Sequence, residues 1–162
     1  YFLISSLQPF STHFNPAVSF VFCVKGEISV KTCTGFVILQ IAGAIAGVML
    51  ANYMFGIEPV NFSEKTRSGT NLFVSEIFAT FGLLLVILLS TKEKVAAGVA
   101  AYIGGAYWFT SSTSFANPAG TIGRAFSDTF AGISPDDVLA FCCAQVAGAF
   151  LAFLLYKKVF SK

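Results

Sequence analysis

The chain has 162 residues; 56% of them are hydrophobic, only 11% are charged, and the mean hydropathy is +0.77. A soluble globular domain carries about 25% charged residues, so this composition excludes that class and indicates a membrane protein. The net charge of +2, with no basic cluster, also excludes a nucleic-acid partner.

The first third of the sequence predicts one incomplete and one complete membrane span. Residues 1–7 are apolar but too short to cross a bilayer, and the sequence opens without Met, so we expect an N-terminally truncated chain. Residues 15–24 are apolar until charge returns at Lys25, and we expect a half-helix there. Residues 33–55 have about the 20 residues that a full span requires.

The remainder of the sequence repeats this order after a charged loop at residues 56–70. Full spans are expected at residues 71–90, from residue 95 to the Ser/Thr-rich stretch after 109, and at residues 138–160. A second half-helix is expected to begin at Asn117 and to end near Gly132. The sequence therefore predicts four full spans, one partial span and two half-helices.

Basic residues are distributed unequally between the predicted membrane faces. Cytoplasmic loops carry an excess of Lys and Arg, so the face with more basic residues is expected in the cytoplasm and the protein in the plasma membrane. That face would hold Lys25, Lys31, Lys92, Lys94, Lys157, Lys158 and Lys162.

The triplet Asn-Pro-Ala occurs twice, as Asn15-Pro16-Ala17 and as Asn117-Pro118-Ala119. Asn is a preferred N-cap and Pro a preferred first helical residue, so each triplet predicts a helix start. About ten residues rise about 15 Å, which is half of a hydrocarbon core. Irregular backbone at that depth is tolerated where it lines a cavity, so the triplets predict a pore near the membrane midplane. The alternative is that both Asn side chains only cap helices.

An internal repeat accompanies the triplets. The stretch Gln40–Ala44 recurs as Gln145–Ala149, each time in a span that follows a half-helix. We expect one membrane domain over residues 1–162, with 1–55 the remainder of a first repeat and 71–160 an inverted second repeat.

With these motifs the chain resembles the bacterial members of the aquaporin and aquaglyceroporin superfamily, the major intrinsic proteins. Residues 13–18 resemble the first signature of the family and residues 113–119 the second. The resemblance implies an all-α polytopic fold of six spans, of which the first and most of the second are missing here. It also implies a homotetramer, a passive channel and no cofactor or metal.

By counting back and forward from Asn117, the resemblance places the selectivity filter at Gly105, Ser114 and Gly120. Two of these positions have no side chain, so the filter is expected to be wide and to pass water, glycerol, urea or undissociated metalloid acids such as arsenite. Arg124, four residues after Gly120, is either a displaced filter cation or a vestibule residue paired with Asp128.

Four further polar side chains lie in the predicted spans or next to the first triplet. By resemblance Glu76 accepts hydrogen bonds from the second re-entrant loop, and the alternative is a snorkelling carboxylate. Gln40 and Gln145 are expected to satisfy re-entrant backbone. His13 is the only His, and no Cys or acidic residue accompanies it in the sequence motif, so we expect it to line the pore or support the loop and not to bind a metal.

Two other functions compete with the passive channel. No catalytic constellation is present, so an enzyme is not expected. An ion-coupled secondary transporter would use Glu76 as its coupling residue. A non-conducting, truncated remnant is the third possibility.

Overall fold

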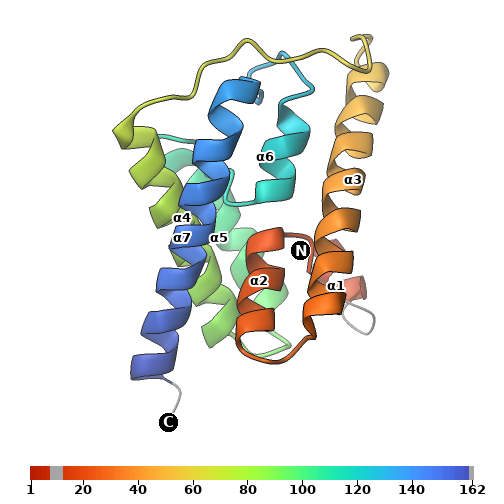
Figure 1. Ribbon diagram of the computed structural model, residues 1–162. Coiled ribbons are helices and arrows are strands. Elements are labelled where there is room, and N and C mark those ends of the chain that lie inside the picture. Colours follow the sequence, from red (N-terminus) through yellow and green to blue (C-terminus); the bar gives the residue numbers. More distant parts are fainter. Residues whose placement is uncertain (8–12, 161–162) are drawn as a thin grey trace.

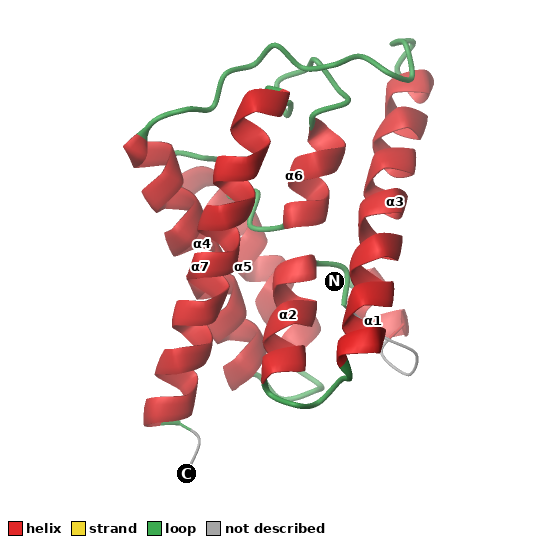
Figure 2. Ribbon diagram, in the orientation of Figure 1, coloured by secondary structure: helices red, strands yellow, loops and turns green. Residues whose placement is uncertain are grey.

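The computed structural model describes residues 1–7 and 13–160. This part of the chain is helical apart from its loops, and Figure 2 draws no strand in it. The helices are α1 (Phe2–Leu7), α2 (Pro16–Val24), α3 (Val30–Met54), α4 (Thr70–Leu89), α5 (Val95–Phe109), α6 (Pro118–Arg124) and α7 (Pro135–Val159). The predicted all-α fold with two re-entrant half-helices is confirmed.

Three helices, α3, α4 and α7, are long and apolar enough to cross a membrane, with mean hydropathies of 2.0, 2.5 and 2.3. The prediction of four full spans needs correction, because α5 has only 15 residues. Thr110 ends α5 in an extended conformation while its hydroxyl donates to the Ala106 carbonyl oxygen at 2.7 Å. From Thr110 the chain continues as a loop that leads to the start of α6 at Pro118.

The two half-helices α2 and α6 lie end to end between α3 and α7, with their N-termini facing each other (Figure 1). Helix α2 agrees with the sequence prediction. Helix α6 does not, because it ends at Arg124 instead of near Gly132. Asn61 N–H donates to the Phe126 carbonyl oxygen and Ser63 N–H to that of Ala125, so the α3–α4 loop takes carbonyls that a longer helix would need.

The α3–α4 loop, residues 55–69, runs across the end of the helices where α6 stops (Figure 1). Asn52 near the end of α3 is buried and donates to the carbonyl oxygens of Pro59 and Phe126. At the other end of the loop, Arg67 N–H donates to the Asp137 carboxylate at 2.6 Å. The loop is therefore attached to α3, to the segment after α6 and to α7.

Close helix contacts depend on small residues in the second half of the chain. An ideal Cβ on Gly148 of α7 would lie 2.3 Å from the Ile77 carbonyl oxygen on α4. The sequence spacing Gly43-x-x-x-Gly47 in α3 suggests a similar contact, but a Cβ on either residue would meet no atom within 4 Å. Only the second-half glycine packs against a helix of this chain.

We expect Gly148→Ala to destabilise the chain by about 1–3 kcal/mol, because the added methyl group overpacks the α4–α7 contact. Gly47→Ala is the matched control: it adds the same methyl group where nothing is near, and Ala is the better helix former. Thermal unfolding in detergent measures both. Equal unfolding temperatures for the two variants would contradict the packing argument.

The basic residues expected on one membrane face lie at one end of the molecule. Figure 1 places the α2–α3 turn, the α4–α5 turn and the end of α7 at the same end, opposite the α3–α4 loop. Lys162 lies outside the described residues. The basic residues that the positive-inside rule counts therefore lie at the same end of the folded chain.

Candidate functional site

The local role of each Asn-Pro-Ala triplet is to start a half-helix. Asn15 Oδ1 accepts from Ala17 N–H at 2.9 Å, and Asn117 Oδ1 accepts from Ala119 N–H at 3.0 Å and more weakly from Gly120 N–H at 3.3 Å. Both Asn residues are in the extended conformation, and Pro follows each in the first helical turn. The side-chain oxygen of each Asn is thus used within its own half of the molecule.

The side-chain nitrogens of the same two residues join the halves. Asn15 Nδ2 donates to the Ala116 carbonyl oxygen at 2.6 Å, and Asn117 Nδ2 donates to the Phe14 carbonyl oxygen at 3.0 Å. Each bond runs from one triplet to the residue just before the other. An amide group has two N–H donors, so a second donor remains on each Asn for a solute.

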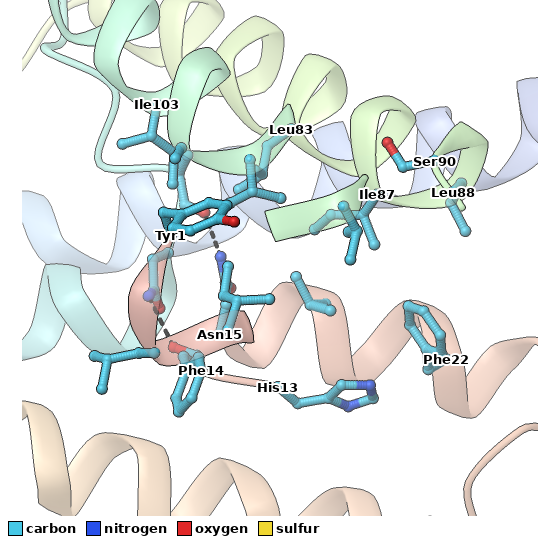
Figure 3. Close-up of a pocket in the computed structure, with 18 of the residues that line it drawn as sticks. Tyr1, His13, Phe14, Asn15, Phe22, Leu83, Ile87, Leu88, Ser90 and Ile103 are labelled. Carbon is cyan, nitrogen blue, oxygen red and sulfur yellow. Dashed lines mark hydrogen bonds between the residues drawn. The ribbon is translucent and has the colours of Figure 1, made fainter. Parts of the chain in front are cut away.

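These bonds lie at a cavity of about 880 Å³. Figure 3 shows Phe14 and Asn15 on its wall, with the two inter-loop hydrogen bonds as dashed lines and apolar side chains of α4 and α5 opposite. His13 and Asn117 also line the cavity. The wall is therefore mainly apolar, with polar groups concentrated where the half-helices meet.

The loop before the second triplet has an unusual backbone. Thr113, Ser114 and Ala116 have φ angles of 62°, 47° and 47°, a left-handed region that side chains other than glycine rarely adopt. Such strain persists only where surrounding contacts hold it. The contacts here come from Glu76, which is fully buried in α4.

Both carboxylate oxygens of Glu76 bind the loop backbone. Oε1 accepts from Phe115 N–H and Oε2 from Ala116 N–H, each at 2.9 Å. Gln145 Nε2 of α7 donates to Oε2 at 2.7 Å and to Thr121 Oγ1 of α6 at 2.8 Å. A buried network thus ties α4, the loop, α6 and α7 together.

The first half has a smaller counterpart of this network. Gln40 Nε2 of α3 donates to the His13 carbonyl oxygen at 2.5 Å and to Ser19 Oγ of α2 at 2.9 Å. His13 packs between the rings of Phe22 and Phe36 at 4.7 and 5.6 Å. Among the described residues no group of three His, Cys, Asp or Glu side chains could hold a metal ion.

The three positions predicted to form the filter carry little side-chain bulk. A Cβ on Gly120 would meet only the Asn117 side chain, at 3.6–3.8 Å, and a Cβ on Gly105 only the Phe109 ring, at 3.4 Å or more. Ser114 Oγ is buried and has no hydrogen-bond partner among the described residues. Two of the predicted positions are therefore bare, the third carries a buried and unbonded hydroxyl, and none of the three is among the residues that line the cavity.

Several backbone carbonyls just before the two triplets already accept a hydrogen bond. Those of His13 and Phe14 accept from Gln40 and Asn117, and that of Ala116 accepts from Asn15. A carbonyl oxygen has two lone pairs, so each engaged group keeps one acceptor position.

Comparison with known proteins identifies the family. Residues 10–110 match the sequence model of the major intrinsic protein family. Aquaglyceroporin AqpS of Rhizobium meliloti (strain 1021) is 46% identical over 159 residues, which cover 96% of this chain and 68% of the relative. The chain belongs to the major intrinsic protein family. Its members are channels and not enzymes.

Two eukaryotic relatives of this major intrinsic protein are more distant. Human aquaporin-5 is 30% identical over 176 residues, covering 95% of this chain and 63% of the relative. Probable aquaporin TIP2-2 of Oryza sativa subsp. japonica is 27% identical over 154 residues, covering 91% and 62%. The chain thus spans about two thirds of the length of these curated relatives. It is a multi-pass membrane protein of a family of channels for water or small solutes.

The ion pair between Arg124 and Asp128 that sequence spacing suggested is absent from this major intrinsic protein. The Arg124 guanidinium lies over the Phe115 ring, with its Cζ 4.2 Å from the ring centroid. Asp128 Oδ1 instead accepts from Glu64 N–H at 3.1 Å and Ser63 Oγ at 3.5 Å. Arg124 therefore lies against the re-entrant loop and not beside the acidic residue.

Sequence reasoning counted Arg67 only as one charge in a loop, and it did not single out Asn52. Both are buried polar residues of the described chain, and both attach the α3–α4 loop to the segment around α6. For Asn52, a polar residue within an apolar span was a usable signal. For Arg67 the sequence contains no such signal, because a loop Arg is normally solvated.

Proposed function

We propose that the chain forms a passive channel in the plasma membrane for water and small neutral solutes such as glycerol, urea or undissociated metalloid acids like arsenite. The observation that carries this proposal is the pair of crossed hydrogen bonds, from Asn15 to Ala116 and from Asn117 to Phe14. They place two amide groups side by side at a mainly apolar cavity. The AqpS relative, named an aquaglyceroporin, supports the choice of solutes.

In the proposed mechanism a neutral solute exchanges its water hydrogen bonds for bonds to fixed groups. The remaining amide hydrogens of Asn15 and Asn117 donate to it, and carbonyl oxygens of the two loops accept from it. Protons and cations are excluded there, because they would have to shed water between amide donors and two facing helix N-termini. Gly105, Gly120 and Ser114, whose Oγ has no hydrogen-bond partner among the described residues, form the proposed wide filter.

Stopped-flow light scattering on liposomes that contain the chain tests this function. A sucrose gradient should cause rapid shrinking, and a glycerol gradient should cause shrinking followed by rapid reswelling. A pH-sensitive dye inside the liposomes should report no accelerated proton entry. Fluxes equal to those of empty liposomes would overturn the proposal and favour the non-conducting remnant.

No observation favours the ion-coupled transporter. Its coupling carboxylate would be Glu76, but both oxygens of Glu76 accept hydrogen bonds from the loop backbone, and the residue does not line the cavity. Dependence of glycerol flux on a proton gradient would reverse this judgement.

We also propose a homotetramer, on the basis of family membership. The most apolar stretch of α3 has none of its residues buried within the chain, which leaves apolar surface for lipid or for other subunits. Light scattering coupled to size exclusion in detergent measures the protein mass of the particle. A monomeric mass at all detergent concentrations would contradict the proposal.

A further inference from the structure

Arg67 is a buried cation whose side chain has no carboxylate partner. Only 6% of the residue is exposed, and its guanidinium donates to the carbonyl oxygens of Gly132 at 2.7 Å, Phe130 at 3.1 Å and Ser112 at 3.3 Å. The ion pair found in residues 1–7 and 13–160 is a different one, Lys25 with Glu27. A buried charge is costly to retain, so a positive charge at this place needs a reason beyond folding.

A second guanidinium lies on the same aromatic ring. The Cζ of Arg67 is 4.7 Å from the Phe115 ring centroid, and the Cζ of Arg124 is 4.2 Å from it. These two distances keep the two Cζ atoms within about 9 Å of each other, which is close to the Debye length of about 8 Å at physiological salt. We call Arg67, Phe115 and Arg124 the Phe115 cluster.

The pKa of Arg67 responds to its buried position and to the charged groups around it. Burial lowers the pKa of Arg67 and the positive charge of Arg124 lowers it further, whereas the charges of Glu76 and Tyr107 raise it. The face of an aromatic ring attracts cations, so Phe115 partly offsets the repulsion between the two groups. Phe115 is also among the residues that line the cavity.

The two arginines differ in the donors that they can offer. Arg67 is held by three carbonyl oxygens, whereas Arg124 has no hydrogen-bond partner among the described residues. Gly120 is four residues before Arg124 on α6, and side chains on a helix lean toward its N-terminus. Arg124 thus has N–H donors without a partner in the described chain, about one helical turn from the predicted filter position that lacks a side chain.

We propose that the Phe115 cluster is a relocated cationic selectivity filter, in which Arg124 donates hydrogen bonds to neutral hydroxylated solutes and Arg67 holds it in place and reinforces the positive field. This inference rests on the channel function proposed above. The cluster contributes its positive charge one turn farther along α6 than Gly120, the predicted filter position that has no side chain. The opening at Gly120 stays wide enough for a polyol, while cations are repelled.

The first test compares glycerol and methylammonium uptake in liposomes. Arg124→Gln should raise methylammonium flux about tenfold, because one positive charge is removed at short range, and it should lower glycerol flux, because the shorter amide offers fewer N–H donors to the solute. Arg67→Gln should change the ratio of the two fluxes in the same direction, and Arg67→Lys, which keeps the charge, should restore it. If Arg67 had only a structural role, Arg67→Gln would lower both fluxes together. The ratio of methylammonium to glycerol flux would then be the same in Arg67→Gln and Arg67→Lys.

Lys65→Gln is the matched control. Lys65 is a cation on the same α3–α4 loop, but its Nζ lies over the Phe130 ring, 4.3 Å from the centroid, and not over Phe115. Its neutralisation should leave the methylammonium to glycerol ratio unchanged. Phe115→Leu should raise that ratio, because it removes the ring that holds both guanidinium groups.

A second test does not depend on conduction. Gly120→Cys provides a thiol at the filter, and its reaction rates with an anionic and a cationic methanethiosulfonate are compared, with the unsubstituted chain as background for the native cysteines. The anionic reagent should react faster, and adding Arg124→Gln should reduce the rate ratio about tenfold. A ratio of anionic to cationic reaction rates that Arg124→Gln leaves unchanged would overturn the relocated filter. So would Arg124→Gln and Phe115→Leu channels that pass glycerol and still exclude methylammonium as well as the unsubstituted chain does. Loss of all flux in the unsubstituted chain, with the thiol result as expected, would overturn the channel function instead.

Discussion

Replacing Glu76 by Ala should abolish solute flux and destabilise the chain by about 3–5 kcal/mol. The substitution leaves two buried N–H groups, those of Phe115 and Ala116, without an acceptor, and each such loss costs about 1–3 kcal/mol. The same N–H groups belong to the loop with left-handed backbone at Ser114 and Ala116. Without the carboxylate, the bonds from Ser114 N–H to Ser112 Oγ and from Asn15 to the Ala116 carbonyl oxygen hold the strained loop alone, and we expect the start of the second half-helix to leave its position at the cavity.

Thermal unfolding and stopped-flow light scattering on Glu76→Ala measure the two effects. Glu76→Gln is the informative companion, because the amide keeps one acceptor oxygen but turns an N–H₂ group toward a backbone donor. It should lie between the parent and Glu76→Ala in both measurements. Glu93→Ala, in the exposed turn after α4, is the control for loss of an acidic residue and should be neutral. Normal flux in Glu76→Ala would reject the supporting role of Glu76.

Gly120→Arg should reduce glycerol flux about tenfold or more and water flux much less. The position has room for a side chain, since a Cβ there meets only the Asn117 side chain at ordinary contact distance. A guanidinium would then fill the wide opening and select by size against the larger solute. The magnitude corresponds to an added barrier of about 1.4 kcal/mol or more.

The measurement is the ratio of osmotic water to glycerol permeability in liposomes. Gly120→Ala adds the Cβ without the cation and should change the ratio little. Combining Gly120→Arg with Arg124→Gln should keep methylammonium excluded, because the new cation replaces the relocated one. Equal loss of both fluxes in a folded Gly120→Arg chain would remove Gly120 from the filter.

Features that depend on neighbours in sequence were predictable. Asn15 and Asn117 cap the helices that follow them, because the cap bond reaches only two or three residues along the chain. The spans followed from apolar length, with ends displaced by a few residues: α3 begins at Val30 instead of Cys33 because Ser29 caps it. Family membership followed from the paired triplets and their surroundings.

Features that depend on partners far away in sequence were not predictable from spacing. The pattern Arg124 to Asp128 fits a helical ion pair, but the helix ends at Arg124 because the α3–α4 loop binds the carbonyls beyond it. Two small-residue spacings look alike in sequence, yet of Gly47 and Gly148 only the latter packs against another helix.

By itself, the sequence determined that this is an all-α membrane protein, because composition, length and capping act locally, and its resemblance to the major intrinsic proteins indicated the channel family. Only the tertiary structure decided that the two Asn side chains bond across the halves and that Arg67 and Arg124 meet at Phe115. Arg67 is 48 positions before Phe115 in the sequence, and no periodicity connects a loop to a residue that distant. Burial and three carbonyl partners, which exist only in the folded chain, place its charge there.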